Sequence, residues 1–206
     1  IYNGETKEKN IAASFMNKNK HLKIIDVSKG LTVKRDEEEL WLCPSNYLML
    51  AQNIKNELLE YTSSTLLKQE INNNYDKLKL IISSYDAELK VIAESSSNPT
   101  IVAANDVFKF LEKYGFKVLS IEENDLANPA ELNEAKNNIK NKLNSYIFIL
   151  NTDTINDLTK SLENEGAIIA NVQSMINLTD EEYKDGYDYE QMMDTFIETI
   201  KTEVYN

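Results

Sequence analysis

The stretch TIVAANDVFKFLEKYGFKVLSI, residues 100–121, holds the clearest signal of secondary structure in this chain. It opens with a buried-strand pattern at 100–104, continues with a short helix pattern at 107–114 that ends at Gly115, and closes with a second strand pattern at 117–121. Short apolar runs that alternate with helices are typical of a parallel sheet with helices on its faces. The stretch therefore predicts an α/β fold.

The same alternation continues to the end of the chain. Pro129 stands in the first turn of a predicted helix, where its fixed φ is favourable, and Gly166 ends another predicted helix. We expect residues 97–206 to form a complete C-terminal α/β lobe. The further strands are predicted at 146–150 and 167–172, and the further helices at 129–143, 154–165 and 187–205.

A long helical region precedes this lobe. Between Pro44 and Pro99 the chain holds neither glycine nor proline, which is typical of helix. A first helix is expected to open at Pro44, and a second at 65–94 would make a rod of roughly 45 Å. A coiled coil is the alternative, but the α/β pattern that follows disfavours it. The apolar residues of the second helix recur at gaps of three and four and are Leu67, Ile71, Tyr75, Leu78, Ile82, Tyr85, Leu89 and Ile92.

The N-terminal part has a sparser pattern, with the end of a strand at 1–4, a helix at 5–18 and a strand at 22–27. So few elements cannot make a well-covered sheet, and we expect an incomplete N-terminal lobe that borrows material or lacks sequence upstream of Ile1. Because the chain opens without a methionine or a signal sequence, we expect a processed or trimmed product. The predicted division is 1–62 for the rest of the N-terminal lobe, 63–96 for a rigid linking helix and 97–206 for the C-terminal lobe.

The composition excludes several classes of function. The 206 residues hold 22 basic and 34 acidic side chains, and the formal net charge of −12 argues against nucleic acid or an anionic membrane surface as the main partner. A single cysteine, Cys43, excludes an internal disulfide framework, and a single histidine, His21, excludes a site of clustered imidazoles. No apolar run reaches the length of about 18 residues that a membrane span needs.

The sequence does not support an enzyme. It has no glycine-rich phosphate loop, no GxSxG nucleophile elbow and no HExxH helix. Cys43 has no histidine near it in sequence and is expected to be buried packing, while His21 is expected in an exposed loop. Trp41 either lines a pocket or packs in the core. These residues predict a protein that binds a partner without catalysing a reaction.

Polar residues follow the predicted strands, and ligands of open parallel sheets bind beyond the carboxyl ends of the strands. Carboxylates and amides suit hard cations or hydrogen-bonding solutes and are poor ligands for zinc. The alternative is that these residues are helix caps and solvated loops. The candidates are Asn105, Asp106, Glu122, Glu123, Asn151, Thr152, Asp153, Gln173 and Ser174 in the C-terminal lobe, and Asp36, Glu37, Glu38 and Glu39 in the N-terminal one.

The chain resembles the zinc/manganese substrate-binding lipoproteins of bacterial ABC importers, also described as adhesin lipoproteins. The most specific stretches are WLCPSNYLMLAQNIKN at 41–56 and NDVFKFLEKYGFKV at 105–118. The order of the elements matches as well, so the resemblance covers essentially the whole chain. Further matching stretches are IYNGE at 1–5, KIIDVSKG at 23–30, YIFILN at 146–151 and YDYEQMMDTFIETIKTE at 187–203.

The resemblance implies two parallel-sheet α/β lobes joined by one long rigid helix, with a metal ion held between the lobes. It implies delivery of the ion to the membrane permease of an ABC importer, and attachment to the membrane only through a lipid anchor outside this chain. The expected protein is a monomeric, extracytoplasmic, cell-surface lipoprotein. Usage rich in lysine, asparagine and isoleucine, with Arg35 the only arginine, indicates a clostridial-type Gram-positive relative.

The metal-ligand positions of the family are substituted wherever this chain can be compared. Glu39 stands where the family has a histidine two residues before the tryptophan, and Asn105 where a second histidine follows the first strand of the C-terminal lobe. Asn151 stands in place of a glutamate and Gln173 in place of an aspartate. We therefore expect an altered or lost site for a divalent ion, zinc or manganese by resemblance. Two alternatives stay open, namely another solute, and a surface adhesin or interaction lipoprotein that binds no metal.

Overall fold

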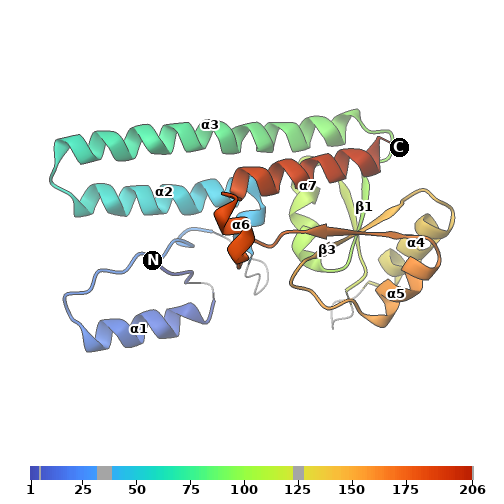
Figure 1. Cartoon of the computed structure of the whole chain (residues 1–206), viewed down its shortest axis with the longest axis horizontal. Coiled ribbons are helices and arrows are strands. Elements are labelled where there is room, and N and C mark those ends of the chain that lie inside the picture. The colour runs from blue at the N-terminus through green and yellow to red at the C-terminus, as the bar shows by residue number, and fades with distance from the viewer. Residues whose placement is uncertain (5, 32–38, 123–127, 206) are drawn as a thin grey trace. The chain divides into compact units, whose positions relative to one another are not determined.

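The chain divides into two compact units, unit 1 (Ile1–Asp86) and unit 2 (Ala87–Asn206), and each is described by itself (Figure 1). A parallel four-stranded sheet in unit 2 confirms the predicted α/β class. The pair of lobes and the three-part division stay predictions. No helix in the described part of the chain is long and apolar enough to cross a membrane. The computed structural model describes residues 1–4, 6–31, 39–122 and 128–205.

Unit 1 consists mainly of helices, and the two predicted long helices are present. Figure 1 shows α2 and α3 side by side, and Lys55 of α2 places its Nζ 4.6 Å from the ring centroid of Tyr75 in α3. Pro44 starts α2, where the missing N–H costs no hydrogen bond. α3 continues from unit 1 into unit 2. The helices are α1 (Glu8–Lys18), the short 3₁₀ helix η1 (Leu40–Leu42), α2 (Pro44–Tyr61) and α3 (Thr65–Ser95).

The two predicted N-terminal strands meet only through a single parallel bridge, which pairs Tyr2 with Asp26 in the described residues of unit 1. Tyr2 N donates to the carbonyl oxygen of Ile25 at 2.9 Å, and Val27 N donates to that of Tyr2 at 3.0 Å. A strand is stabilised by a partner along its length, and here the pairing stops after one bridge. The predicted second sheet therefore stays a prediction.

Gly4 and Asp26 fix this bridge. Gly4 N donates to Asp26 Oδ1 at 3.0 Å and to Ser28 Oγ at 2.9 Å. A Cβ at position 4 would lie 2.1 Å from Asp26 Oδ2, so a side chain there would displace the Asp26 carboxylate. Asn53 of α2 then donates from Nδ2 to the carbonyl oxygen of Val27 at 2.7 Å, which holds the segment against the helix.

The sheet of unit 2 has the strand order β2-β1-β3-β4, with every neighbouring pair parallel. The central pairing joins β1 to β3 and places Val102 opposite Ile147 and Ala103 opposite Phe148. Each strand lies within one residue of its predicted bounds. The strands are β1 (Thr100–Ala103), β2 (Lys117–Ser120), β3 (Tyr146–Leu150) and β4 (Ile168–Val172).

The helices of unit 2 follow the predicted order with two differences. The short helix after β1 is a 3₁₀ helix, η2 (Asp106–Tyr114), which ends at Gly115 with a φ of 104°. The apolar pattern does not predict α6 (Asp180–Lys184), because five residues are too few to show a helical period. The other helices are α4 (Pro129–Lys140), α5 (Asp157–Asn164) and α7 (Tyr189–Val204).

The helices α4 and α5 cover one face of this sheet. Side chains alternate between the faces of a strand, and Val102, Leu119 and Ile147 share this face and are fully buried. Ala135 of α4 and Leu162 of α5 pack against them. Full burial of a Val, Leu or Ile side chain contributes roughly 1.5–3 kcal/mol, so this layer holds both helices on the sheet.

Aromatic rings cover the opposite face. The ring centroid of Phe148 in β3 lies 6.3 Å from that of Phe196 in α7 and 6.3 Å from that of Phe108 in η2. Figure 1 shows α7 along the last turns of α3, where Lys201 Nζ lies 2.8 Å from Glu88 Oε1. α7 therefore connects the sheet to the end of the long helix.

The buried carboxylate of Glu203 fixes the end of α7 to the start of β3. Its side chain accepts hydrogen bonds from Asn144 Nδ2 at 2.5 Å, from Ser145 N at 3.1 Å and from Tyr146 N at 3.2 Å. Burial raises the pKa of Glu203 above its ordinary value, and these donors lower it in part. Without the carboxylate the N–H groups at the strand start would lose their acceptors.

Replacing Glu203 by alanine should lower the free energy of unfolding by about 1–3 kcal/mol, because buried donors lose their acceptor. Urea unfolding of the two proteins measures the difference. The matched control is Glu198→Ala, which removes an exposed carboxylate of the same helix and should change the free energy by less than about 1 kcal/mol. Equal losses in the two variants would contradict the role given to Glu203.

Candidate functional site

The central pairing of the sheet decides where polar groups gather. β1 and β3 are neighbours, but the chain leaves β1 toward β2 on one side and leaves β3 toward β4 on the other. In open parallel sheets ligands bind at such a reversal, beyond the carboxyl ends of the strands. Asn105 follows β1 there, and Asn151 and Asp153 follow β3.

Asn105 connects these two strand ends. Its Oδ1 accepts from Val107 N at 3.2 Å and caps η2, while its Nδ2 donates to Asp153 Oδ2 at 2.5 Å. The same oxygen of Asp153 accepts from Leu150 N at 3.1 Å. Both polar atoms of the Asn105 amide are therefore engaged within the protein.

The Asp153 carboxyl has a shifted pKa. Burial raises the pKa of Asp153 above its ordinary value, and the negative charge of Glu122 raises it further. The hydrogen bonds from Leu150 N and Asn105 act in the opposite direction and lower the pKa. Burial and the charge of Glu122 thus raise the pKa of this carboxyl by more than the two hydrogen bonds lower it.

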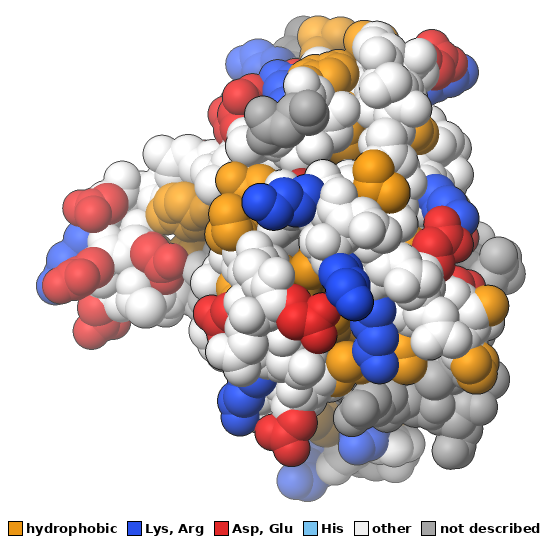
Figure 2. Space-filling model, turned by 90° about the vertical axis from the view of Figure 1, so that its right-hand side faces the viewer, with side chains coloured by type: hydrophobic (Ala, Val, Ile, Leu, Met, Phe, Trp, Pro, Cys, Tyr) orange, Lys and Arg blue, Asp and Glu red, His pale blue; other side chains and the backbone are white. Residues whose placement is uncertain are grey.

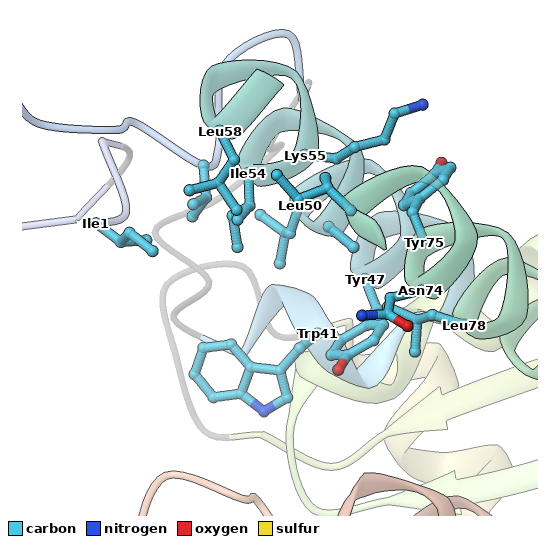
Figure 3. A pocket seen from close by; sticks show the side chains of 13 residues that line it. Ile1, Trp41, Tyr47, Leu50, Ile54, Lys55, Leu58, Asn74, Tyr75 and Leu78 are labelled. Atoms are coloured by element: carbon cyan, nitrogen blue, oxygen red, sulfur yellow. The ribbon is translucent and has the colours of Figure 1, made fainter. Parts of the chain in front are cut away.

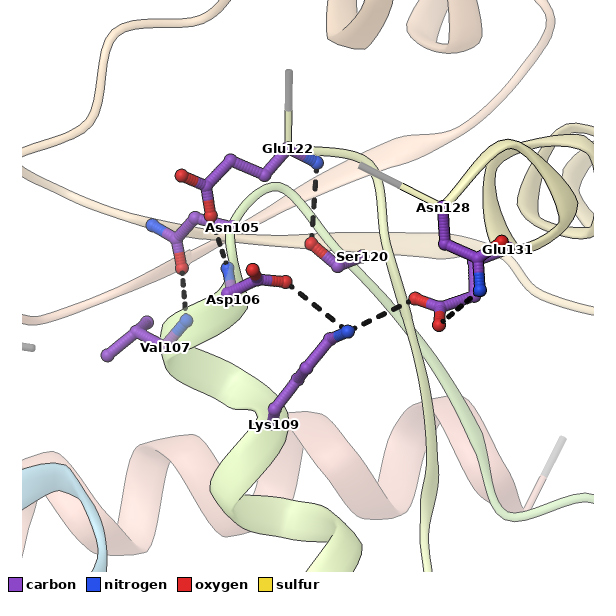
Figure 4. A network of polar contacts seen from close by, with 8 residues as sticks. All are labelled: Asn105, Asp106, Val107, Lys109, Ser120, Glu122, Asn128 and Glu131. Carbon is purple, nitrogen blue, oxygen red and sulfur yellow. Dashed lines mark hydrogen bonds and ion pairs between the residues drawn. The ribbon is translucent and has the colours of Figure 1, made fainter. Parts of the chain in front are cut away.

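A second set of polar contacts surrounds Asp106 (Figure 4). Asp106 N donates to Glu122 Oε2 at 2.8 Å, and Glu122 N donates to Ser120 Oγ at 3.3 Å. Lys109 Nζ lies 3.5 Å from Asp106 Oδ1 and 3.2 Å from Glu131 Oε2. These carboxylates therefore already have a cationic partner from the protein itself.

Asn151 and Gln173 form a third set of contacts. Asn151 Nδ2 donates to Gln173 Oε1, and Asn151 Oδ1 accepts from Ser174 N at 2.9 Å. Gln173 Nε2 donates to Glu182 Oε1 at 2.8 Å, and Glu182 Oε2 accepts from Thr179 N at 2.7 Å. The residues that follow β3 and β4 are thus in contact with each other and with α6.

Three of the four predicted ligand positions, Asn105, Asn151 and Gln173, follow strands at one edge of the sheet of unit 2. Asn151 and Gln173 are in direct contact, whereas Asn105 contacts Asp153. Glu39 belongs to unit 1, where it is half-buried and precedes η1. Metal binding by these four residues stays a prediction. Of the other acidic candidates, Asp36, Glu37, Glu38 and Glu123 lie outside the described residues.

The residues that take part in these contacts but do not follow a predicted strand include Glu182 in α6 and Lys109 in η2. The spacing of Thr179 and Glu182 is that of a capping box, and both hydrogen bonds of the box are present. Lys109 stands three residues after Asp106, a spacing at which helical side chains are neighbours. These two spacings in the sequence could have predicted the contacts of Glu182 and Lys109.

The side chains at this edge that could bind a metal ion carry carboxylate and amide groups. Within the described ranges, no group of three or more His, Cys, Asp or Glu side chains could hold a metal ion. Cys43 is buried and His21 is exposed, as the sequence predicts. Neutral amides are weak donors to zinc and manganese compared with imidazole.

Unit 1 contains an apolar cavity of about 550 Å³ (Figure 3). Trp41 lines it together with apolar side chains of α2 and α3, among them Leu50, Ile54 and Leu78. Of the two alternatives for Trp41, the structure thus shows the pocket. An apolar lining suits hydrocarbon groups and offers little to a metal ion.

Acidic and basic side chains are interspersed on the face of the molecule in Figure 2, and apolar side chains reach that surface in small separate areas. Single exposed apolar side chains of this kind are ordinary on soluble proteins. The net charge of −12 therefore does not gather into one acidic area on this face.

The model of one protein family matches residues 1–203 of the chain, and its description is "ZnuA: Zinc-uptake complex component A periplasmic". The match thus spans nearly the whole sequence, including both units. No curated protein matches the chain.

Several solved structures share the fold. The metal-dependent lipoprotein YcdH from Bacillus subtilis is 18% identical, with a TM-score of 0.76 over 100% of this chain and 79% of that one. The Zn(II)-bound ZnuA-like domain of Streptococcus pneumoniae AdcA is 18% identical, with a TM-score of 0.72 over 99% and 81%. The periplasmic zinc-binding protein TroA from Treponema pallidum is 19% identical, with a TM-score of 0.68 over 98% and 79%.

Two substitutions should shift the pKa of Asp153 in opposite directions. Glu122→Gln should lower it, because a neighbouring negative charge is removed, and Asn105→Ala should raise it, because a hydrogen-bond donor is removed. NMR titration of the Asp153 carboxyl carbon measures both. An unchanged pKa in both variants would contradict the contacts described for this edge.

The same group gives stability a predictable dependence on pH. The folded-state pKa of Asp153 is raised above the ordinary value of 3.8, so the protonated carboxyl stabilises the folded state. This contribution to the free energy of unfolding is fully present below pH 3.8 and is lost as the pH rises through the folded-state pKa. Glu122→Gln should make this loss of stability smaller, because it reduces the difference between the folded-state and unfolded-state pKa of Asp153. Urea unfolding over a pH series measures the slope, and an unchanged slope would count against the coupling.

Proposed function

The chain belongs to the ZnuA family of substrate-binding proteins of metal-uptake ABC transporters, and we propose that it captures a divalent metal ion and delivers it to a membrane permease. The observation that carries this proposal is the family match over residues 1–203. The family is non-enzymatic, so its members bind their substrate without transforming it. Membership also implies an ABC transporter permease as the partner.

The family consists of periplasmic or extracellular lipoproteins. We propose that this member is held at the surface of a Gram-positive cell by a lipid anchor upstream of Ile1 and acts as a monomer. The B. subtilis protein of similar fold, which is described as a lipoprotein, supports the anchor.

The proposed substrate is zinc or manganese, and zinc is the ion named for the S. pneumoniae and T. pallidum proteins of similar fold. We propose Glu39, Asn105, Asn151 and Gln173 as its donors, because they stand at the ligand positions that the family resemblance implies. One carboxylate and three amides should bind these ions more weakly than imidazoles would. The side-chain oxygens of the three amides accept hydrogen bonds from Val107 N, Asn151 Nδ2 and Ser174 N, which supports a weakened site, because a metal ion would compete for these oxygens.

We further propose that polypeptide preceding Ile1 completes the N-terminal lobe, with α3 as the link to the C-terminal lobe. The single bridge between Tyr2 and Asp26 supports this, because it leaves extended backbone that a further strand could pair with. The apolar lining of the cavity in unit 1 supports it as well, since a neighbouring element would remove that surface from water.

A second candidate function is that of a surface or interaction lipoprotein that binds no metal. The hydrogen bonds at the ends of β3 and β4 favour it, because Asn151 and Gln173 have hydrogen-bond partners within the protein. The lack of a three-residue metal group among the described residues favours it too. Its role in adhesion stays a prediction.

Zinc added to chelator-stripped protein should bind at one site. At 100 times the Kd it should raise the free energy of unfolding by about 2.7 kcal/mol, because only the folded state binds the ion. Calorimetry measures the stoichiometry, and urea unfolding measures the gain in stability. Glu39→Ala should abolish the gain, whereas Glu60→Ala, which removes an exposed carboxylate of α2, should preserve it.

A variant with restored imidazoles separates the two candidates. Glu39→His combined with Asn105→His should bind zinc more tightly than the natural protein, because imidazole is the stronger donor. If neither protein binds zinc at millimolar concentration, the metal proposal fails and the second candidate is favoured.

A further inference from the structure

Glu182 lies outside the predicted ligand positions, yet its carboxylate contacts one of them, Gln173. Glu182 Oε1 accepts from Gln173 Nε2 at 2.8 Å, and Gln173 Oε1 accepts in turn from Asn151 Nδ2. Asn151 Oδ1 accepts from Ser174 N at 2.9 Å. These hydrogen bonds run without a break from the end of β3 across the end of β4 to α6.

The two oxygens of Glu182 have different partners. Oε2 accepts from Thr179 N at 2.7 Å and from Thr179 Oγ1 at 2.9 Å, which forms half of the capping box of α6. Oε1 accepts from Gln173. The carboxylate of Glu182 therefore joins the capping box of α6 to the side chain of Gln173.

The backbone after β4 has an uncommon conformation. Met175 has a φ of 60°, a left-handed conformation that residues other than glycine rarely adopt. Ser174 beside it is fully buried, and its N–H is bound by Asn151. A conformation of this kind persists only where the surrounding structure holds it, and the residue before Met175, Ser174, is buried and bound to Asn151.

We propose that Glu182 is a positioning residue for the substrate site, which orients the amide of Gln173 directly and that of Asn151 through Gln173. Gln173 Nε2 is bound by the carboxylate, so Gln173 Oε1 is directed to Asn151. This inference rests on the proposed function, in which the two amides serve as donors for the metal ion. Removal of groups that orient metal ligands typically weakens metal binding about 10–100-fold.

Three variants separate positioning from helix capping. Glu182→Ala removes both contacts, Thr179→Ala removes the hydroxyl of the capping box and leaves Glu182 Oε1 with Gln173, and Glu181→Ala removes an exposed neighbour. The side-chain NH₂ signals of Asn151 and Gln173 in ¹H–¹⁵N spectra of metal-free protein are the readout. Both should shift and exchange faster in Glu182→Ala, and neither should do so in the other two variants.

Calorimetry with zinc chloride gives the functional readout. Glu182→Ala should raise the Kd about 10-fold or more, whereas Thr179→Ala and Glu181→Ala should leave it within a factor of about two of the natural protein. Unchanged NH₂ signals, or equal zinc affinity in Glu182→Ala and natural protein, would overturn the positioning role. If the natural protein binds no zinc, the proposed function fails, while the NH₂ signals still decide whether Glu182 orients the two amides.

Discussion

The parallel pairing of β1 with β3 is the constraint on which the rest of unit 2 depends. Because these neighbours send the chain to opposite sides of the sheet, their following residues meet at one edge. The hydrogen bond from Asn105 to Asp153 crosses this point. Buried apolar layers on both faces, with Ile147 on one and Phe148 on the other, keep the strands in register and hence keep this edge in place.

The chemistry of this edge follows from its amide side chains, which form hydrogen bonds more readily than they bind metal ions. A histidine or carboxylate at a ligand position would favour a divalent ion, but Asn105, Asn151 and Gln173 are neutral and pair within the protein. Lys109 adds a positive charge beside Asp106 and Glu131. The family scaffold is therefore combined with an edge whose amides are engaged in hydrogen bonds within the protein, and a metal ion must compete for the amide oxygens.

Much of this could be predicted from the sequence. Apolar runs such as 146–150 predict the strands, because strands covered on both faces need apolar side chains throughout. The absence of glycine and proline predicts α3. Residues 22–27 have an equally strand-like pattern but meet a partner at one bridge only, since a strand depends on neighbours that its own pattern does not specify. Likewise, the contact between Asn151 and Gln173 depends on β4 lying beside β3. The apolar pattern of the sequence does not specify the order of the strands in the sheet.

We propose that the carboxyl edge of the sheet in unit 2 provides donors for a divalent ion. The most direct test is a crystal structure of chelator-stripped protein soaked in zinc, with diffraction recorded at the zinc absorption edge. We expect one anomalous peak about 2.0–2.2 Å from a side-chain oxygen of Asn105, Asn151 or Gln173. No peak, or a peak remote from all three side chains, would contradict it.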